Sequence, residues 1–185
     1  MFIDSIVIGI IIALILGGSF QGLLSISLKH PWIIAASFLV QFSSIFFLSE
    51  HLLWAVIISN MGLLLFCFFN RKFPGFKYMV IGILLNVAVM VANGGRMPVD
   101  IDAARILSPQ DVPALLAGTY GKHTALTDQT HLNFLGDIFF LQHPYPHQTI
   151  ISLGDIVFSL GVILFFYAAM VKGKKNYKEV NGLET

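Results

Sequence analysis

Five apolar segments set the strongest constraint on how this chain can fold. A helix that crosses a bilayer needs about 20 mostly apolar residues, and each segment comes close to that length. Of the 185 residues, 56% are hydrophobic and only 11% are charged, whereas a soluble domain carries roughly 25% charged residues. We therefore predict one all-α integral membrane domain, residues 1–185, with about five transmembrane helices over residues 2–16, 32–48, 52–69, 79–92 and 150–171.

The basic residues predict how these helices cross the membrane. With five spans, the basic residues of the short connections and of the tail all fall on one side: Lys29, Arg71, Lys72, Lys77, Lys172, Lys174, Lys175 and Lys178. Asp4 and Glu50 fall on the other side. Because lysine and arginine favour the cytoplasmic face, we predict an outside N-terminus and a cytoplasmic C-terminus. We expect the tail, residues 172–185, to be a solvated cytoplasmic end.

The long connection between the fourth and fifth segments, residues 93–149, then forms an extracytoplasmic loop that carries most of the polar side chains. A connection of this length is usually functional or disordered. Residues 101–107 and 112–117 are typical of short amphipathic helices at the interface, with Asp100 and Asp111 as capping residues. We expect the loop to fold against the mouth of the bundle through apolar anchors, namely Leu132, Phe134, Phe139, Phe140 and Leu141.

Two aspartates flank the start of the last apolar segment, and they are the candidate catalytic residues. Asp137 follows a glycine in the loop, and Asp155 follows a glycine eighteen positions later. A carboxylate at a bilayer boundary is costly to desolvate and is a functional candidate. Two carboxylates in one partly dry site can share a proton and activate water. Alternatively, Asp137 caps a helix that starts near Ile138, and Asp155 caps one that starts near Ile156.

The segment Asn93-Gly94-Gly95-Arg96 closes the fourth apolar segment. Paired glycines allow the backbone to leave a helix with positive φ, and Pro98 prevents the helix from continuing. One interpretation is a helix terminator whose arginine reaches the lipid headgroups. In the other, the four residues of the segment form a substrate-binding site, in which Asn93 and Arg96 bind a carbonyl group or pair with a carboxylate.

The histidines, the net charge, Asn86 and the single cysteine give little further indication of function. His123, His131, His143 and His147 match no firm zinc pattern, so we expect surface histidines, no metal and no cofactor. A metal-dependent hydrolase would need three of them to converge with the aspartates. The net charge of +1 argues against a nucleic-acid partner. Asn86, inside the fourth segment, is expected to join helices. The only cysteine, Cys67, lies in an apolar segment and excludes a disulfide framework.

The end of the chain resembles lipoprotein signal peptidase, the membrane aspartic peptidase of bacteria. The resemblance rests on the sequence around Asp137, on Ile151-Ser152-Leu153-Gly154-Asp155, and on a final helix with a central glycine, Gly161. It departs from that family at Ser152, in the spacing of the aspartates, in a long insertion before Asp137, and in the extra N-terminal span. The resemblance implies that Asp137 and Asp155 share a proton and cleave a membrane-associated peptide at the outer face, with Asn93 or Arg96 orienting it.

As a whole, the chain resembles an uncharacterised family of small bacterial membrane proteins that forms a domain of unknown function. The shared features are the Asn-Gly-Gly-Arg-Met-Pro segment at residues 93–98 and the late Gly-Asp before the final helix. This resemblance implies a multi-pass protein of the bacterial inner membrane, in contact with lipid, and no assigned activity. The alternative to a peptidase is therefore a non-catalytic accessory protein or transporter subunit that binds a partner protein through its outer loop.

Overall fold

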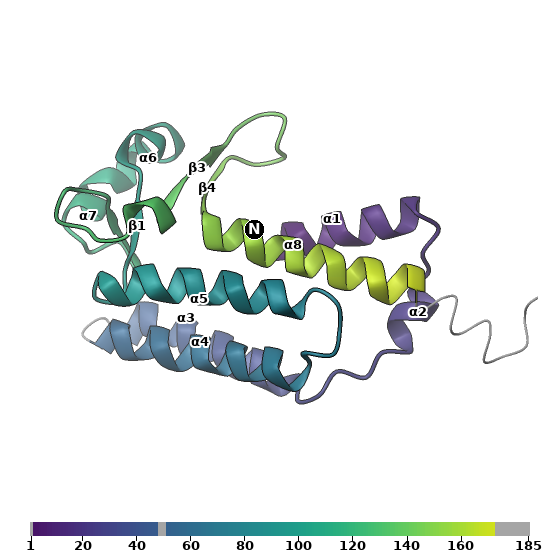
Figure 1. Ribbon diagram of the computed structural model, residues 1–185. Coiled ribbons are helices and arrows are strands. Elements are labelled where there is room, and N and C mark those ends of the chain that lie inside the picture. Colours follow the sequence, from purple (N-terminus) through teal and green to yellow (C-terminus); the bar gives the residue numbers. More distant parts are fainter. Residues whose placement is uncertain (1, 48–50, 173–185) are drawn as a thin grey trace, which may run out of the picture.

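The computed structural model describes residues 2–47 and 51–172, and most of these are helical (Figure 1). Five long helices lie side by side and make up the bundle: α1 (Phe2–Ile15), α3 (Trp32–Phe47), α4 (Leu52–Phe69), α5 (Phe76–Ala92) and α8 (Leu153–Tyr167). A short helix, α2 (Phe20–Leu24), follows α1, and a π-helical turn, η4 (Ala168–Lys172), extends α8. Glu50 and residues 173–185, which include three lysines of the predicted topology, lie outside the described residues.

The five helices correspond to the five predicted segments, with two differences at their ends. The fourth begins earlier, at Phe76, directly after Gly75, whose φ is 91°. The fifth begins later, at Leu153, because the preceding residues Thr149–Ser152 form a strand. Two of the helices, Leu52–Phe69 and Leu153–Val171, are long and apolar enough to cross a membrane, and the other three are shorter apolar helices.

Helices α5 and α8 pack at very short distance because glycines face each other at two levels. A Cβ atom on Gly82 would lie 2.5 Å from the Gly154 carbonyl oxygen and 2.6 Å from the Phe158 backbone nitrogen. A Cβ atom on Gly161 would lie 2.7 Å from the Gly75 carbonyl oxygen. Small residues in this arrangement are how helices approach closely in membrane proteins. The contact fixes the start of α8, and therefore Asp155, against the middle of α5.

The long connection contains a four-stranded sheet, so the prediction of an all-α protein is wrong. The strands are β1 (Met97–Val99), β2 (His123–Ala125), β3 (Asp137–Leu141) and β4 (Thr149–Ser152), in the order β2-β1-β3-β4. β1 is parallel to both β2 and β3, whereas β3 and β4 form an antiparallel hairpin. Strands of three to five residues are too short to show a clear alternating pattern, which is why the sequence did not reveal them.

Short helices cover this sheet, and both predicted helices of the loop are confirmed. They are α6 (Ile101–Leu107) and α7 (Val112–Leu116), joined by the 3-10 turn η2 (Pro109–Asp111). The carboxylate of Asp100 caps α6, as predicted, because it accepts a 2.8 Å hydrogen bond from the Ala103 amide. Asp111 precedes α7 but makes no capping hydrogen bond. Its carboxylate is therefore free to serve another role in this unit.

The sheet and its covering helices, residues 97–152, form what we call the outer unit, and it packs on one end of the bundle (Figure 1). Met97 of β1 and Leu135 of the 3-10 turn η3 (Asn133–Leu135) are buried with four residues of α4 and α5: Leu52, Val56, Val89 and Met90. The loop therefore folds against the bundle, as expected. The anchors differ, since Leu135 is 6% exposed but Phe134 is 64% exposed.

Candidate functional site

The sheet places Asp137 in the interior of the outer unit. Asp137 is the first residue of β3, and it pairs with Val99 of β1 and Ser152 of β4. Its carbonyl oxygen accepts a 3.0 Å hydrogen bond from the Asp100 amide, and only 8% of the residue is exposed. Asp137 therefore opens a strand, and the alternative in which it caps a helix near Ile138 is wrong.

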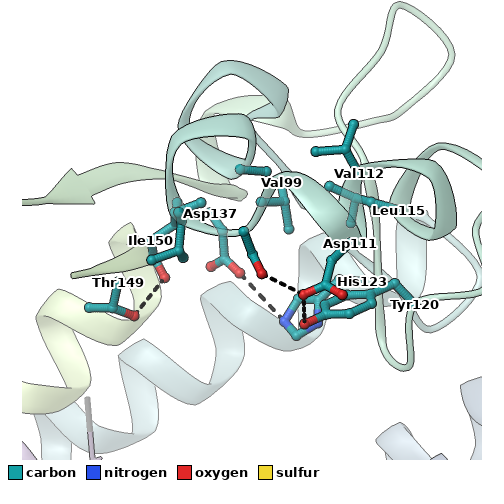
Figure 2. A pocket seen from close by; sticks show the side chains of 12 residues that line it. Val99, Asp111, Val112, Leu115, Tyr120, His123, Asp137, Thr149 and Ile150 are labelled. Atoms are coloured by element: carbon teal, nitrogen blue, oxygen red, sulfur yellow. Dashed lines mark hydrogen bonds and ion pairs between the residues drawn. The ribbon is translucent and has the colours of Figure 1, made fainter. Parts of the chain in front are cut away.

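The side chain of Asp137 lines a cavity of about 230 Å³ in the outer unit (Figure 2). Most of the wall is apolar, and a few polar groups converge on it. The lining residues come from β1, α6, η2, α7, β2, β3 and β4 and the connections beside them: Val99, Ala104, Leu107, Ser108, Asp111, Val112, Leu115, Tyr120, His123, Asp137, Thr149 and Ile150. Apolar walls with a small set of placed polar groups are typical of small-molecule and substrate sites.

His123 of β2 lies beside Asp137 in the lining of this cavity. Its Nε2 atom lies 3.7 Å from Oδ2 of Asp137 (Figure 2). Two hydrogen bonds hold the turn before β2: the Arg96 guanidinium donates to the Gly121 carbonyl, and the Met97 amide donates to the Lys122 carbonyl at 2.8 Å. Arg96 therefore positions the segment that carries His123.

Burial shifts both groups toward their uncharged forms. Burial, assisted by the negative charge of Asp155, raises the pKa of Asp137 to about 8, against a smaller opposite effect of Lys122. Burial and the charge of Lys122 lower the pKa of His123 to about 4. At neutral pH the cavity therefore contains a carboxylic acid beside an unprotonated imidazole, which are a proton donor and a proton acceptor. Strongly shifted pKa values in a cavity are typical of catalytic and binding sites.

A second carboxylate, Asp111, also lines the cavity. Oδ2 of Asp111 accepts hydrogen bonds from Ser108 Oγ at 2.7 Å and from the Tyr120 hydroxyl at 3.1 Å (Figure 2). Burial and the Asp111 carboxylate raise the pKa of Tyr120 above its ordinary value. Tyr120 thus remains a hydrogen-bond donor, and the cavity lining holds a hydrogen-bonded group of Ser108, Asp111 and Tyr120 besides Asp137 and His123.

Asp155 lies outside the lining of this cavity and has a capping role at the start of α8. The Ser152 hydroxyl accepts from the Asp155 amide at 3.0 Å, and Oδ2 of Asp155 accepts from the Ser152 amide at 3.2 Å. Oδ1 of Asp155 accepts from Asn86 Nδ2 at 2.9 Å. The capping alternative is therefore confirmed in modified form, because Ser152 is the N-cap and the helix starts at Leu153, before Ile156.

Asn86 joins α5 to α8, as predicted. Besides the bond that its side-chain nitrogen donates to Asp155, its side-chain oxygen Oδ1 accepts a hydrogen bond from the Ser152 hydroxyl at 2.8 Å. Gly154 must lack a side chain here, because a Cβ atom would collide with the Asn86 amide. Asp137 thus lines the cavity, whereas Asp155 lies at the start of α8. The negative charge of Asp155 raises the pKa of Asp137.

The segment Asn93–Arg96 connects the outer unit to the bundle. The side-chain nitrogen of Asn93 donates to the backbone carbonyls of Val89 and His131, at 2.7 and 2.8 Å. Its side-chain oxygen accepts from the backbone amide of His131 at 2.8 Å. Gly94 and Gly95 have φ values of 65° and 90°, and a Cβ atom on Gly95 would lie 2.7 Å from the Leu53 backbone. These contacts fit a helix terminator. None of the four residues belongs to the cavity lining, and their role in substrate binding stays a prediction.

His131, His143 and His147 do not belong to the cavity lining. His131 contacts Asn93 through its backbone, and His147 Nε2 lies 3.4 Å from Oδ1 of Asp4, at the start of α1. Across residues 2–47 and 51–172, no group of three or more His, Cys, Asp or Glu side chains is placed to hold a metal. Sequence reasoning identified Asp137 but missed His123, Asp111 and Tyr120 as its neighbours, because only the sheet and its covering turns bring them together.

These features define a mostly helical protein with two helices long enough to cross a membrane and a cavity between its four-stranded sheet and the short helices that cover it. The chain belongs to the DUF5317 family of unknown function, whose model matches residues 25–167. An uncharacterized protein of Thermotoga maritima is 33% identical over 169 residues, which cover 90% of each chain. No solved structure matches. The family match includes every residue that lines the cavity of the outer unit.

The coupling between the two aspartates leads to a testable expectation. Asp155→Asn removes a negative charge that raises the pKa of Asp137, so this pKa should fall below about 8. It should stay above the ordinary value of aspartate, because burial is the larger cause. Carbon-13 NMR titration of aspartate-labelled protein measures it, with Asp128→Asn, on the exposed surface, as the matched control. An Asp137 pKa that is the same in all three proteins would contradict the coupling.

Proposed function

We propose that this protein is a five-span protein of the bacterial inner membrane with its outer unit on the extracytoplasmic face. The first support is the surface of the bundle. Each of its five long helices exposes large apolar side chains, among them Val7, Leu39, Ile58, Leu84 and Leu160, which are 46–68% exposed. Soluble monomers rarely expose a continuous apolar surface of this extent, and a bilayer would cover it.

The positions of charged groups support the orientation. His147 Nε2 lies 3.4 Å from Oδ1 of Asp4, so the start of α1 lies beside the connection between β3 and β4. At the opposite end, the Asn70 side chain binds the Lys29 backbone through two hydrogen bonds of 2.8 and 3.0 Å. The basic connections before α3 and between α4 and α5 thus lie together, at the end of the bundle away from the sheet (Figure 1). This is the distribution expected when the outer unit faces away from the cytoplasm.

Cysteine labelling in intact cells tests this topology. In a Cys67→Ala background, Gln129→Cys in the outer unit should react with a membrane-impermeant maleimide, whereas Lys72→Cys should react only after the cells are opened. Both positions are exposed on the protein surface, so the membrane alone decides access. Reaction at residue 72 in intact cells, with protection at residue 129, would reverse the proposed orientation.

We further propose that the outer unit is a hydrolase that cleaves a membrane-associated peptide at the outer face. The carrying observation is the buried, protonated Asp137 that lies beside unprotonated His123 in the cavity. His123 takes a proton from water as the water oxygen attacks the peptide carbonyl, and Asp137 donates its proton to the leaving amine as the C–N bond breaks. The proton on His123 then returns to Asp137, whose oxygen lies 3.7 Å away.

This mechanism differs from that of an aspartic peptidase in the group that activates water, which is His123 and not a second aspartate. Both Asp155 oxygens already accept hydrogen bonds, from Asn86 and from the Ser152 amide, which makes Asp155 a poor group to activate water. His123 lines the cavity and is unprotonated at neutral pH. Asp155 instead supports the reaction as a positioning residue, because its charge helps to keep Asp137 protonated.

Peptide mass spectrometry of membranes tests the hydrolase proposal. Cells that contain only the Asp137→Asn or the His123→Gln variant should accumulate an unprocessed peptide, since loss of a general acid or base slows reactions about 10²–10⁴-fold. Wild type and Asp128→Asn, which alters an aspartate in an exposed turn, should process it equally. If all four strains contain the same peptides, the protein is not a peptidase.

That outcome would favour a second candidate, a non-catalytic subunit that binds a partner protein through the outer unit. One observation supports it directly: Ile106, Leu116 and Phe134 of the outer unit are 62%, 56% and 64% exposed. Exposed apolar groups beside a polar surface are typical of interaction sites. Changing these three residues to serine should release the partner and leave the peptide profile unchanged.

A further inference from the structure

The bundle contains an apolar cavity of about 240 Å³ that shares no lining residue with the cavity of Asp137 and His123. The helices pack as a series in which α1 contacts α8, α8 contacts α5, α5 contacts α4, and α4 contacts α3. Side chains from all five helices line the cavity, including Ile6, Phe38, Phe66, Met79 and Val162. A space with this lining does not attract water, so its natural occupant is a hydrocarbon group.

A second cavity, of about 320 Å³, lies at the basic end of the bundle. Lys29, Arg71 and Lys72 line it together with the polar residues Ser27 and Asn70, and no acidic residue belongs to its lining. The Arg71 guanidinium is held in place, 4.3 Å above the Phe68 ring and 3.3 Å from the Phe68 carbonyl oxygen. Three positive charges around one hollow favour an anionic group.

The two cavities are neighbours. Leu28 lines the apolar cavity, and the residues on either side of it, Ser27 and Lys29, line the basic one. Phe73 of the basic cavity also contacts Phe76 of the apolar cavity, with ring centroids 6.1 Å apart. A molecule with an anionic head and a hydrocarbon chain would therefore meet matching surroundings at both ends.

We propose that the two cavities together bind one anionic phospholipid, with its phosphate beside Lys29, Arg71 and Lys72 and an acyl chain among the five helices. Basic pockets between membrane helices on the cytoplasmic side bind lipid headgroups in this way. A zwitterionic headgroup would fit less well, because its ammonium group would face three cations. The inference rests on the proposed membrane insertion and is independent of the proposed hydrolysis.

Native mass spectrometry of the full chain in detergent tests the head-group preference. Wild type should retain phosphatidylglycerol in preference to phosphatidylcholine with the same acyl chains. Arg71→Gln/Lys72→Gln should reduce that preference by roughly 25-fold, from the attraction typical of two basic residues at a membrane surface. Lys77→Gln/Arg105→Gln removes the same charge outside the cavity and should keep the preference. Equal lipid preference in all three proteins would overturn the proposal.

Photocrosslinking shows where the acyl chain of the lipid lies in the protein. A phosphatidylglycerol with a diazirine on its acyl chain, in vesicles, should label cavity residues such as Phe66 and Cys67. Labelling confined to the outward residues Leu39 and Trp54 would show an ordinary lipid shell and overturn the proposal. Inorganic phosphate should not displace the lipid, and displacement would mean that the site recognises phosphate alone. Failure of the protein to enter vesicles would instead contradict the five-span topology.

Discussion

Asp137→Asn should make the protein more stable in alkaline solution, although it removes the proposed catalytic acid. The wild-type carboxyl group is buried, and its folded-state pKa of about 8 lies far above the ordinary 3.8. Above the ordinary value, the unfolded chain releases this proton while the folded chain keeps it. The stability contributed by Asp137 is therefore complete below pH 3.8 and is lost as the pH rises toward 8.

The contribution of His123 to folding stability has the opposite pH dependence. Its folded-state pKa of about 4 lies below the ordinary 6.5, so its contribution is complete above pH 6.5 and is lost as the pH falls toward 4. The two slopes offset each other between pH 4 and 6.5, and Asp137 acts alone between pH 6.5 and 8. At about 1.4 kcal/mol per pH unit, wild type should lose on the order of 2 kcal/mol across the upper interval.

Asparagine at position 137 cannot ionise, so the loss between pH 6.5 and 8 should disappear. The opposing slope of His123 should then become visible, as falling stability on the acid side. Thermal unfolding of wild type, Asp137→Asn and the surface control Asp128→Asn in one detergent, between pH 4 and 8, measures both effects. A wild-type profile that is flat up to pH 8 would mean that Asp137 is already ionised in the folded protein.

Gly82→Ala should destabilise the bundle strongly, although it adds only one methyl group. The added methyl group would lie 2.5 Å from the Gly154 carbonyl oxygen and 2.6 Å from the Phe158 nitrogen. Both atoms belong to the backbone of α8, so no side chain can rotate away. Overpacking of this kind costs about 1–3 kcal/mol. Because α8 must move, the hydrogen bond between Asn86 and Asp155, 2.9 Å in length, should weaken as well.

The matched control for this change is Leu84→Ala on the same helix. Leu84 is 49% exposed, and its truncation leaves the contact between α5 and α8 unchanged. Thermal unfolding in detergent should therefore show a much larger decrease for Gly82→Ala than for Leu84→Ala. Equal melting temperatures for Gly82→Ala and wild type would show that α5 and α8 are too far apart for the added methyl group to collide with the backbone of α8.

The sequence predicted the bundle better than the outer unit, for physical reasons. Long apolar runs identify helices such as α4 directly, and Asp100 revealed the start of α6 through its capping position. The sheet is built from parallel pairs between distant short strands, such as Met97 with His123, and local sequence patterns contain no information on such pairs. The environment of Asp137 depends on this pairing, and its neighbours could not be predicted.

Asp155 illustrates the same limit. Its position before an apolar helix was visible in the sequence, and both a catalytic and a capping role fitted that position. The reciprocal hydrogen bonds with Ser152 define the cap, and Asn86, which lies on another helix, donates to the other oxygen of the Asp155 carboxylate. The capping role is now defined by hydrogen bonds, and the influence of Asp155 on Asp137 is electrostatic.

The central claim is that Asp137 keeps its proton at neutral pH, and the carbon-13 NMR titration of its side-chain carboxyl measures this directly. Protein labelled at the aspartate carboxyl carbon, compared with Asp137→Asn, assigns the signal. We predict a midpoint at about pH 8, with the carboxyl group protonated at pH 7. A midpoint near the ordinary aspartate value of 3.8 would contradict the account, because an ionised Asp137 could not act as the acid.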